Sequence, residues 1–376
     1  MKSTGDLQLL KRINRSALLR LIRSHPDLSR ARLAAHSGLT KSTVSALVRE
    51  LIDTHWLSEA SAPVAAPGLG RPSTPLNINC DKRVLMGIEI AVETVCLVCV
   101  TLDGSIRLET TLALTDRSPA SACRQMADAA FAMYRQLEAN NWLLTGVGVC
   151  LPGAVNEDLG IVLLAPNLRW RDVAFLEMVC DAFQKAGLPP VPVHLQNDAD
   201  AAALSEYEFG SHASEDPLIF INCDVGVGAG VVLNDRLYTG NAGTAGEVGH
   251  TILQVDGPLC TCGRNGCAET FIGMRALAQP TGVQRGGRYL GIMMQNLDAI
   301  FNPRVLVLGG RSCVEYPELT SVAQDTLHTY ARQAGLVAPQ VRAARYGLQA
   351  AAMGAAALVL HRYLRPLIRN SQELIN

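Results

Sequence analysis

A strand-turn-strand unit that occurs twice in the chain constrains its fold more than any other feature. The first copy has apolar β-type runs at 84–91 and 95–101, the turn Leu102-Asp103-Gly104, and a third strand from Ile106. The second copy has runs at 218–224 and 228–233, the turn Asn234-Asp235, and Leu237-Tyr238. Helical patterns follow or precede these units at 120–137 and 199–208, and a late strand occupies 305–310. The repeat predicts a duplicated α/β fold of two lobes, and ligands favour the cleft between such lobes.

Composition divides the chain into two parts of opposite charge. With 376 residues, 48% hydrophobic and 18% charged, the chain is long enough for more than one domain and is typical of globular proteins. Residues 1–76 carry eleven Lys and Arg against five Asp and Glu, whereas the remaining residues carry 22 against 29. A basic segment on an acidic body suggests that this segment alone meets a polyanion.

Neither export nor membrane insertion is predicted. The first residues contain no uninterrupted apolar stretch, and the apolar run 347–360 is shorter than the ~20 residues that cross a bilayer. We therefore expect a cytoplasmic protein. Because the cytosol keeps thiols reduced, the eleven cysteines argue against a disulfide framework, and clustered cysteines become candidate metal ligands.

The N-terminal segment has the pattern of a helix-turn-helix. Apolar residues at helical spacing over 9–22 predict a first helix that ends near His25-Pro26 and whose arginines face outward. Ser29 can cap a second helix, Gly38 can form the turn, and Thr40 can cap a third helix. The start of the third helix would present the side chains of a recognition helix to DNA, namely Thr40, Lys41, Ser42, Thr43, Ser45 and Arg49. The alternative is a helical bundle with a solvated polar face.

The next segment is rich in Pro, Gly and Ala. It predicts a wing or linker over 61–82, after a winged helix-turn-helix domain at 1–60. Arg71, between Gly70 and Pro72, either enters the minor groove of DNA or is a solvated linker charge. Double-stranded DNA is therefore the expected partner of the N-terminal segment.

Three cysteines, Cys260, Cys262 and Cys267, lie within eight residues of a loop that also contains two glycines, and His250 precedes them by ten residues. One imidazole and three thiolates complete a closed tetrahedral shell, the ligand set of a structural Zn²⁺ site. The alternative is a group of core thiols, but buried thiols are not usually spaced so closely in a glycine-rich loop. We predict a structural zinc ion in the loop 250–267, bound by all four residues.

Two motifs around this loop resemble those of a known family. They are Gly246-Glu247-Val248-Gly249-His250 and the pattern Cys-x-Cys-Gly-x-x-Gly-Cys-x-Glu that ends at Glu269. Together they resemble the signature of the ROK family, which contains sugar kinases and sugar-responsive transcriptional repressors. The resemblance implies a winged helix-turn-helix head and a two-lobed, actin-like sugar kinase fold over 83–376. It also implies a set of sugar-binding residues: Gly153, Asn167, Asn197, Asp198, Glu247, His250 and Glu269.

The chemistry of these side chains suits a sugar. A sugar presents a ring of hydroxyl groups, and carboxylates and amides can accept from and donate to adjacent pairs of them. Alone, Asp198 could be a helix N-cap and Glu247 a solvated loop charge, but their joint placement around the zinc loop favours sugar binding. The two ring nitrogens of His250 could serve the metal and the ligand, so that the metal would position the sugar site.

The resemblance leaves two functions, a repressor without catalysis or an ATP-dependent sugar kinase with an added DNA-binding head. The kinases of the family carry an Asp-x-Gly-Gly-Thr loop and a Gly-Thr-Gly loop, where this chain has Glu89-Ile90-Ala91-Val92-Glu93 and Asp224-Val225-Gly226. Side chains thus replace glycines that phosphates approach, and Glu93 adds negative charge beside a triphosphate. We therefore predict that the chain is not an enzyme and that Asp198, a catalytic base in the kinases, remains as a sugar ligand.

The sequence predicts a transcriptional repressor that binds operator DNA as a homodimer or homotetramer and is released by a sugar or sugar phosphate. It does not specify the sugar or the direction of the response. Sixteen residues, 270–285, stand where family members usually carry a longer helical stretch. This difference bears on lobe closure, dimer geometry and sugar affinity.

Overall fold

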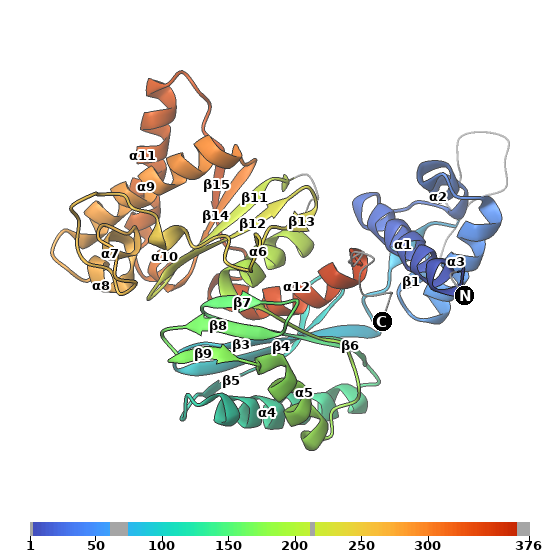
Figure 1. The fold of residues 1–376 in the computed structure, drawn as a ribbon. Helices are drawn as coiled ribbons and strands as arrows, with labels where there is room; N and C mark the ends of the chain where they lie inside the picture. Colours follow the sequence, from blue (N-terminus) through green and yellow to red (C-terminus); the bar gives the residue numbers. More distant parts are fainter. Residues whose placement is uncertain (1–2, 61–73, 211–214, 367–376) are drawn as a thin grey trace.

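The protein consists of an N-terminal head and a two-lobed body (Figure 1). The computed structural model describes residues 3–60, 74–210 and 215–366, so that Arg71 lies outside the described residues. Within these ranges, no helix is both long enough and apolar enough to cross a membrane.

The head is a winged helix-turn-helix. Its described elements are α1 (Ser3–Ser24), α2 (Arg30–Ser37), α3 (Lys41–Asp53), β1 (Leu57–Glu59) and β2 (Leu76–Ile78). β1 and β2 pair antiparallel, with Leu57 opposite Ile78. The strand β2 lies inside the segment that we predicted as wing or linker, and it forms one side of the wing.

The two lobes contain sheets of the same topology, which confirms the predicted repeat. The strand order is β10-β6-β3-β4-β5 in lobe 1 and β15-β14-β11-β12-β13 in lobe 2. In each sheet three strands form an antiparallel meander, and the other two run parallel to the first strand of that meander.

Lobe 1 comprises β3 (Arg83–Ile90), β4 (Thr94–Thr101), β5 (Ile106–Ala113), α4 (Pro119–Ala139), β6 (Leu143–Leu151), α5 (Phe175–Ala186) and β10 (Val193–Asn197), with a small sheet of β7 (Ala154–Asn156), β8 (Ile161–Ala165) and β9 (Trp170–Val173). Lobe 2 comprises α6 (Asp198–Glu208), β11 (Leu218–Cys223), β12 (Val227–Leu233), β13 (Arg236–Leu237), η2 (Val248–His250), α7 (Glu269–Ile272), α8 (Met274–Leu277), α9 (Gly282–Phe301), β14 (Val305–Gly309), α10 (Arg311–Glu315), α11 (Pro317–Gln333) and β15 (Gln340–Ala343). The chain then continues through η3 (Gly347–Gln349) into α12 (Ala350–Leu364).

The apolar run that we judged too short for a membrane span is α12, which lies between the lobes and is buried along most of its length (Figure 1). It packs on α6, β3 and β6. Glycines allow this close approach, because a Cβ at Gly148 would overlap the backbone of Ala355, and a Cβ at Gly354 would overlap the backbone of Ala201. The helix α12 is therefore closely packed both on the sheet of lobe 1 and on α6 of lobe 2.

The expectation that the arginines of α1 face outward holds for the exposed Arg12 but is wrong for the other three. Arg15, Arg20 and Arg23 turn toward the body, where Arg20 lies 2.7 Å from Asp235 and Arg23 lies 2.5 Å from Glu208. The buried apolar side chains of the head also join those around α12 in one continuous cluster. Helical periodicity shows which residues share a face of a helix. It cannot show whether a polar face meets solvent or meets charged residues from a distant part of the chain.

The short segment 270–285 forms α7, α8 and the start of α9. The stretch 279–282, which we predicted as a bypass, is the turn between α8 and α9, and Thr281 adopts a φ of 58° there.

Candidate functional site

The caps of the helix-turn-helix are those expected from the sequence. The Ser29 side chain accepts from the Arg32 amide, and Gly38 ends α2 with a φ of 69°. The Thr40 side chain accepts from the Thr43 amide at 3.2 Å and so caps α3. These local contacts fix where the recognition helix begins.

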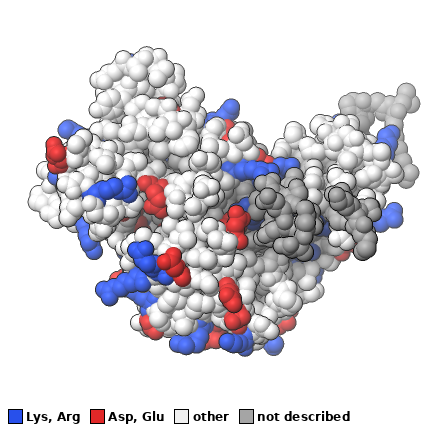
Figure 2. Space-filling model, viewed as in Figure 1, with Lys and Arg blue, Asp and Glu red and all other residues white. Residues whose placement is uncertain are grey.

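The predicted DNA-contacting residues lie on the accessible face of α3. Its buried residues are Val44, Leu47, Val48 and Leu51. By contrast, Thr40, Lys41, Ser42 and Arg49 are exposed, and Thr43 and Ser45 are half-buried. Lys and Arg side chains project from the outer edge of the head, whereas both charges are interspersed over the visible face of the body (Figure 2). The face is thus free to meet DNA.

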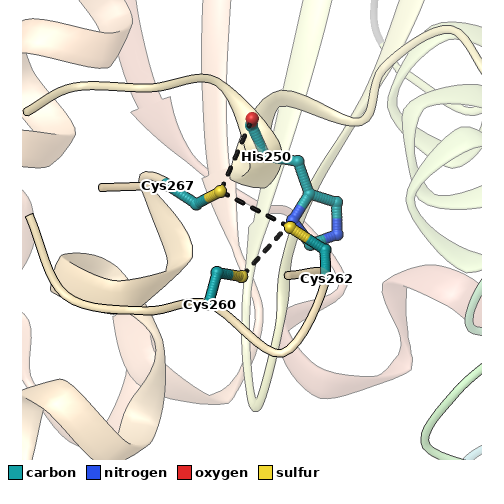
Figure 3. A group of neighbouring side chains, drawn as sticks. All are labelled: His250, Cys260, Cys262 and Cys267. Atoms are coloured by element: carbon teal, nitrogen blue, oxygen red, sulfur yellow. Dashed lines mark hydrogen bonds between the residues drawn. The ribbon is translucent and has the colours of Figure 1, made fainter. Parts of the chain in front are cut away.

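The four predicted metal ligands converge on one point (Figure 3). The candidate ligand atoms of His250, Cys260, Cys262 and Cys267 all lie within 4.8 Å of one another. The Cys262 and Cys267 sulfurs are 3.6 Å apart, and the Cys260 sulfur is 3.7 Å from His250 Nδ1. This cluster could hold a metal ion.

Two carboxylates, Glu247 and Glu269, adjoin the four-residue cluster. The Nδ1 of His250 faces Cys260, while its Nε2 lies 3.9 Å from the Glu247 carboxylate. Glu269, the first residue of α7, has Oε1 3.9 Å from the Cys260 sulfur, and its Oε2 faces Gly226. A metal bound to the cysteines and Nδ1 would therefore orient the ring nitrogen that faces Glu247.

Asn197 and Asp198 lie where β10 passes into α6. Asn197 Nδ2 donates to the Gly153 carbonyl at 2.8 Å, and its Oδ1 accepts from the Ala199 and Asp200 amides at 2.8 and 3.1 Å. Asn197 is therefore the N-cap of α6, a role that we had considered for Asp198. Burial raises the pKa of Asp198 to about 6, and Asp224 and Glu247 add to the effect.

Gly153 and Asn167 are the other two members of the predicted sugar set, and of these Gly153 contacts Asn197 through its carbonyl. Gly153 adopts a φ of 116°, and any side chain there would overlap the carbonyl of Leu164. Asn167 is exposed in the turn between β8 and β9. In the described part of the chain, no side-chain hydrogen bond joins Asn167 to the other predicted residues.

Two further carboxylates, Glu89 and Asp224, interact electrostatically with Asp198. In the sequence we had considered them only as parts of the loops that bind phosphate in the kinases. Glu89 is near the end of β3, and Asp224 follows β11, the equivalent strand of the second lobe. Burial, together with Asp198 and Asp224, raises the pKa of Glu89 to about 8. Glu89 and Asp224 occupy equivalent positions in the two copies of the sequence repeat. From this equivalence we could have predicted that they lie close together.

Glu93 does not have the position expected from the sequence. Its side chain is 76% exposed and lies 3.9 Å from Arg117. The carboxyl groups at this end of the region are therefore those of Glu89 and Asp224 and not that of Glu93, which lies in the turn between β3 and β4.

Comparison with known families supports the resemblance stated above. The family model "ROK family" matches residues 85–286 and 280–362. The chain belongs to the ROK family. A second model, "Winged helix-turn-helix DNA-binding", matches residues 11–57. The predicted family is thus confirmed.

Individual ROK proteins resemble the chain over most of its length. It is 28% identical over 386 residues to the xylose repressor of Bacillus subtilis (strain 168), which covers 96% of this chain and 98% of the relative. A solved ROK family transcriptional regulator, a homologue of the Escherichia coli MLC protein, has a TM-score of 0.77 at 24% identity and covers 94% of this chain and 97% of that one. The predicted head and two-lobed ROK fold are therefore confirmed.

A kinase also resembles the body. The ROK hexokinase of Thermus thermophilus has a TM-score of 0.62 at 26% identity and covers 73% of this chain and 98% of that one. Repressors and kinases thus both occur among the ROK proteins that this chain resembles.

Proposed function

We propose that the chain is a sugar-responsive transcriptional repressor whose ROK body controls the placement of its DNA-binding head. The observation that carries the proposal is the position of α6. This helix begins at Asn197 and Asp198, two predicted sugar ligands, and ends at Glu208, which binds Arg23 of the head. One helix therefore connects the proposed sugar site with the joint between head and body.

The joint is built from buried charges at the end of α6. Glu208 lies 2.5 Å from Arg23, 2.7 Å from His361 Nδ1 and 2.5 Å from Arg365. Its side chain is 1% exposed. If Arg23 moved away from Glu208, the buried carboxylate would lose a compensating charge, which is costly. The joint therefore favours the arrangement in which head and body are in contact over partly separated arrangements.

A second acidic residue extends the joint. Asp235 binds Arg20 at 2.7 Å and Arg365 at 2.5 Å, and it accepts from the Tyr207 hydroxyl at 2.6 Å. Tyr207 also belongs to α6. A displacement of α6 on sugar binding would thus act on both Arg20 and Arg23 of α1.

The proposed sugar ligands are Asn197, Asp198, Glu247, His250 and Glu269, with Gly153 and Asn167 at the margin. Their donors and acceptors suit vicinal hydroxyl groups, and Asn197 is held in place by its cap and its bond to Gly153. Because the ligands come from both lobes, a bound sugar would favour a more closed body.

We propose that the cysteine cluster holds structural Zn²⁺. A tetrahedral zinc ion with Zn–S bonds of about 2.3 Å separates its sulfur ligands by about 3.8 Å, close to the 3.6 Å between Cys262 and Cys267. His250 Nδ1 and the three thiolates would hold the ion, and the ion would hold the loop and the imidazole. Elemental analysis should find one zinc ion per chain in the wild-type protein. The double variant Cys262→Ser with Cys267→Ser should lose this zinc, whereas the control variant Cys313→Ser should keep it. Metal content well below one per chain, or unchanged content in the double variant, would exclude the site.

We further propose that the chain transfers no phosphate. The alternative, an ATP-dependent ROK sugar kinase with a DNA-binding head, is favoured by the likeness to the hexokinase. Ala91 and Val92 replace loop glycines, and the side-chain oxygen of Asp224 already accepts from the Val225 amide at 2.7 Å. A coupled assay with ATP and a panel of sugars should stay at background. Turnover that Asp198→Asn abolishes would establish the kinase instead.

The proposed partner of the head is double-stranded operator DNA, contacted by Thr40, Lys41, Ser42, Thr43, Ser45, Arg49 and Arg71, and we therefore expect the protein to act in the cytoplasm. A homodimer or homotetramer would present two heads to half-sites about 34 Å apart. Sedimentation of the full chain with and without operator gives the oligomeric state. Operator affinity that survives deletion of residues 1–76 would exclude this role of the head.

Operator binding with and without sugar tests the response itself. Wild-type protein should release operator DNA by about 5- to 150-fold when the effector binds, the range of ordinary allosteric coupling. Glu247→Ala should keep zinc and DNA binding but lose the response, because it removes a proposed ligand beside His250 and leaves the metal ligands intact. If Glu247→Ala releases DNA at the same sugar concentration as wild type, the proposed site is wrong.

A further inference from the structure

A second cavity adjoins the proposed sugar site without sharing any of its residues. Its volume is about 180 Å³, and Gln196, which lines it, directly precedes the proposed sugar ligand Asn197. Lobe 1 contributes residues 155–158, from β7 and the turn after it, and lobe 2 contributes residues within 236–243, from β13 and the loop after it. Because a water molecule occupies about 30 Å³ in the liquid, this is room for a molecule about as large as six waters.

The cavity reaches a buried imidazole of the central helix α12. His361 lines the cavity, although its side chain is only 2% exposed. Its Nδ1 lies 2.7 Å from the Glu208 carboxylate, and because a carboxylate can only accept, Nδ1 carries a proton. Burial lowers the pKa of His361, so the ring is neutral and Nε2 is a hydrogen-bond acceptor. Among the described residues, the hydrogen bonds of this ring are all made by Nδ1, which leaves Nε2 for a hydroxyl group of a ligand.

The charged side chains around the cavity leave one guanidinium group for a ligand. Glu157 binds Arg362 through both carboxylate oxygens, and Arg365 pairs with two carboxylates of the joint. Arg236 also lines the cavity, is exposed, and has no carboxylate partner in the part of the chain that the structure describes. Its guanidinium can therefore receive an anionic group without giving up an existing ion pair.

The loop after β13 adds backbone donors beside Arg236. Gly240 and Gly243 adopt φ values of 71° and 74°, and both residues line the cavity together with Asn241. Within residues 215–366 and the other described ranges, the amides of these three residues donate to no acceptor. Unused amides in a turn with positive φ angles are the backbone groups that bind anions in proteins.

We propose that this cavity binds a small hydroxylated anion, a phosphorylated or carboxylated polyol, as a second ligand of the protein. The anionic group binds Arg236 and the amides of the loop, and a hydroxyl group donates to His361 Nε2. The site goes beyond the proposed function, because it is separate from the sugar site. Asp158 opposes the proposal, since this exposed carboxylate also lines the cavity and has no ion-pair partner among the described residues.

Calorimetry of the full chain with glycerol 3-phosphate, glycerate and uncharged glycerol provides the test. We expect at least one of the two anions to bind at least about tenfold more tightly than glycerol, because charge-assisted hydrogen bonds are stronger than neutral ones. Arg236→Ala should weaken binding of that anion at least about tenfold, and Asp158→Asn should strengthen it. Arg288→Ala removes an exposed arginine of α9 that does not line the cavity, and this control should keep the affinity within about twofold.

Inorganic phosphate tests the contribution of the hydroxyl groups. It carries no carbon-bound hydroxyl for His361 Nε2, so it should bind more weakly than glycerol 3-phosphate. Equal affinity for the two would overturn the role given to His361.

Three further results would overturn the site as a whole. They are glycerol binding as tightly as either anion, anion affinity that is unchanged in Arg236→Ala, and failure of all these probes to bind. The measurement contains no sugar and no DNA, so its result does not depend on the proposed sugar response.

Discussion

Glu208 is the buried acidic residue that joins the head to the body. Its carboxylate is buried against Arg23, Arg365 and His361, and burial by itself would raise its pKa. The two arginines reverse this effect and hold the pKa well below its ordinary value of 4.5. A carboxylate with a lowered pKa contributes stability that is present above the unfolded pKa and is lost as the pH falls toward the folded pKa.

Glu208→Gln should therefore destabilise the protein by about 3–5 kcal/mol at neutral pH, because it leaves buried cations without their anion. The difference from wild type should shrink as the pH falls from about 5 to about 3, since wild type then loses the same contribution. Urea unfolding at several pH values measures this. Glu59→Gln, which removes an exposed partner of Arg30, is the control and should cost less than about 1 kcal/mol. A pH-independent difference for Glu208→Gln would contradict the assignment.

At the scale of elements, the central helix α12 depends on glycines in its neighbours. Gly148 of β6 lets the helix approach so closely that a Cβ would overlap the Ala355 backbone. The alanine-rich sequence of α12 also allows this close approach, because small side chains on the helix permit a short distance between helix and sheet.

Gly148→Ala should consequently lower the free energy of unfolding by about 1–3 kcal/mol, the usual cost of adding a methyl group to a packed core. Gly228→Ala adds the same group where the nearest atom would be Ala199 Cβ at 3.4 Å, and it should cost clearly less. Chemical denaturation of both variants measures the difference. Equal effects would show that α12 can shift without cost.

The recognition helix α3 should bind DNA mainly through its exposed basic residues. Lys41→Ala and Arg49→Ala should each weaken operator binding, and the slope of log affinity against log salt should become shallower by about one per lost phosphate contact. Lys185→Ala, on the exposed surface of α5, is a matched control that should leave both values unchanged. Unaltered affinity in both α3 variants would require another DNA-binding face.

At the scale of the whole molecule, α6 joins the proposed sugar site to the head. A substitution that breaks the contact between Arg23 and Glu208, without changing the proposed sugar site or the DNA-contacting residues, should uncouple sugar binding from DNA binding. We expect Arg23→Ala to retain sugar affinity and to reduce the ratio of operator affinities without and with sugar at least about fivefold, which corresponds to about 1 kcal/mol of coupling. Titration of operator DNA at zero and saturating sugar gives this ratio for wild type and variant.

Arg117→Ala removes an exposed arginine whose partner Glu93 lies away from the joint, and the affinity ratio should stay at the wild-type value. An Arg23→Ala protein with a wild-type ratio would mean that the sugar acts on the head by another route, for example through dimer geometry alone.

The sequence by itself determined the features that depend on neighbouring residues. The helix caps at Ser29 and Thr40, the glycine turn at Gly38 and the strands of the repeat follow from side chains only a few positions apart. The cysteine loop is also local, so the convergence of its four candidate ligands could be predicted from spacing.

Only the tertiary structure decided which distant groups meet. Arg23 and Glu208 are 185 residues apart, and no helical pattern could show that the arginines of α1 face buried carboxylates instead of solvent. The inward position of Glu89, the outward position of Glu93 and the choice of Asn197 as the cap of α6 likewise required the folded chain. Periodicity specifies the faces of an element, whereas the charge and burial that a face meets depend on where the rest of the chain packs.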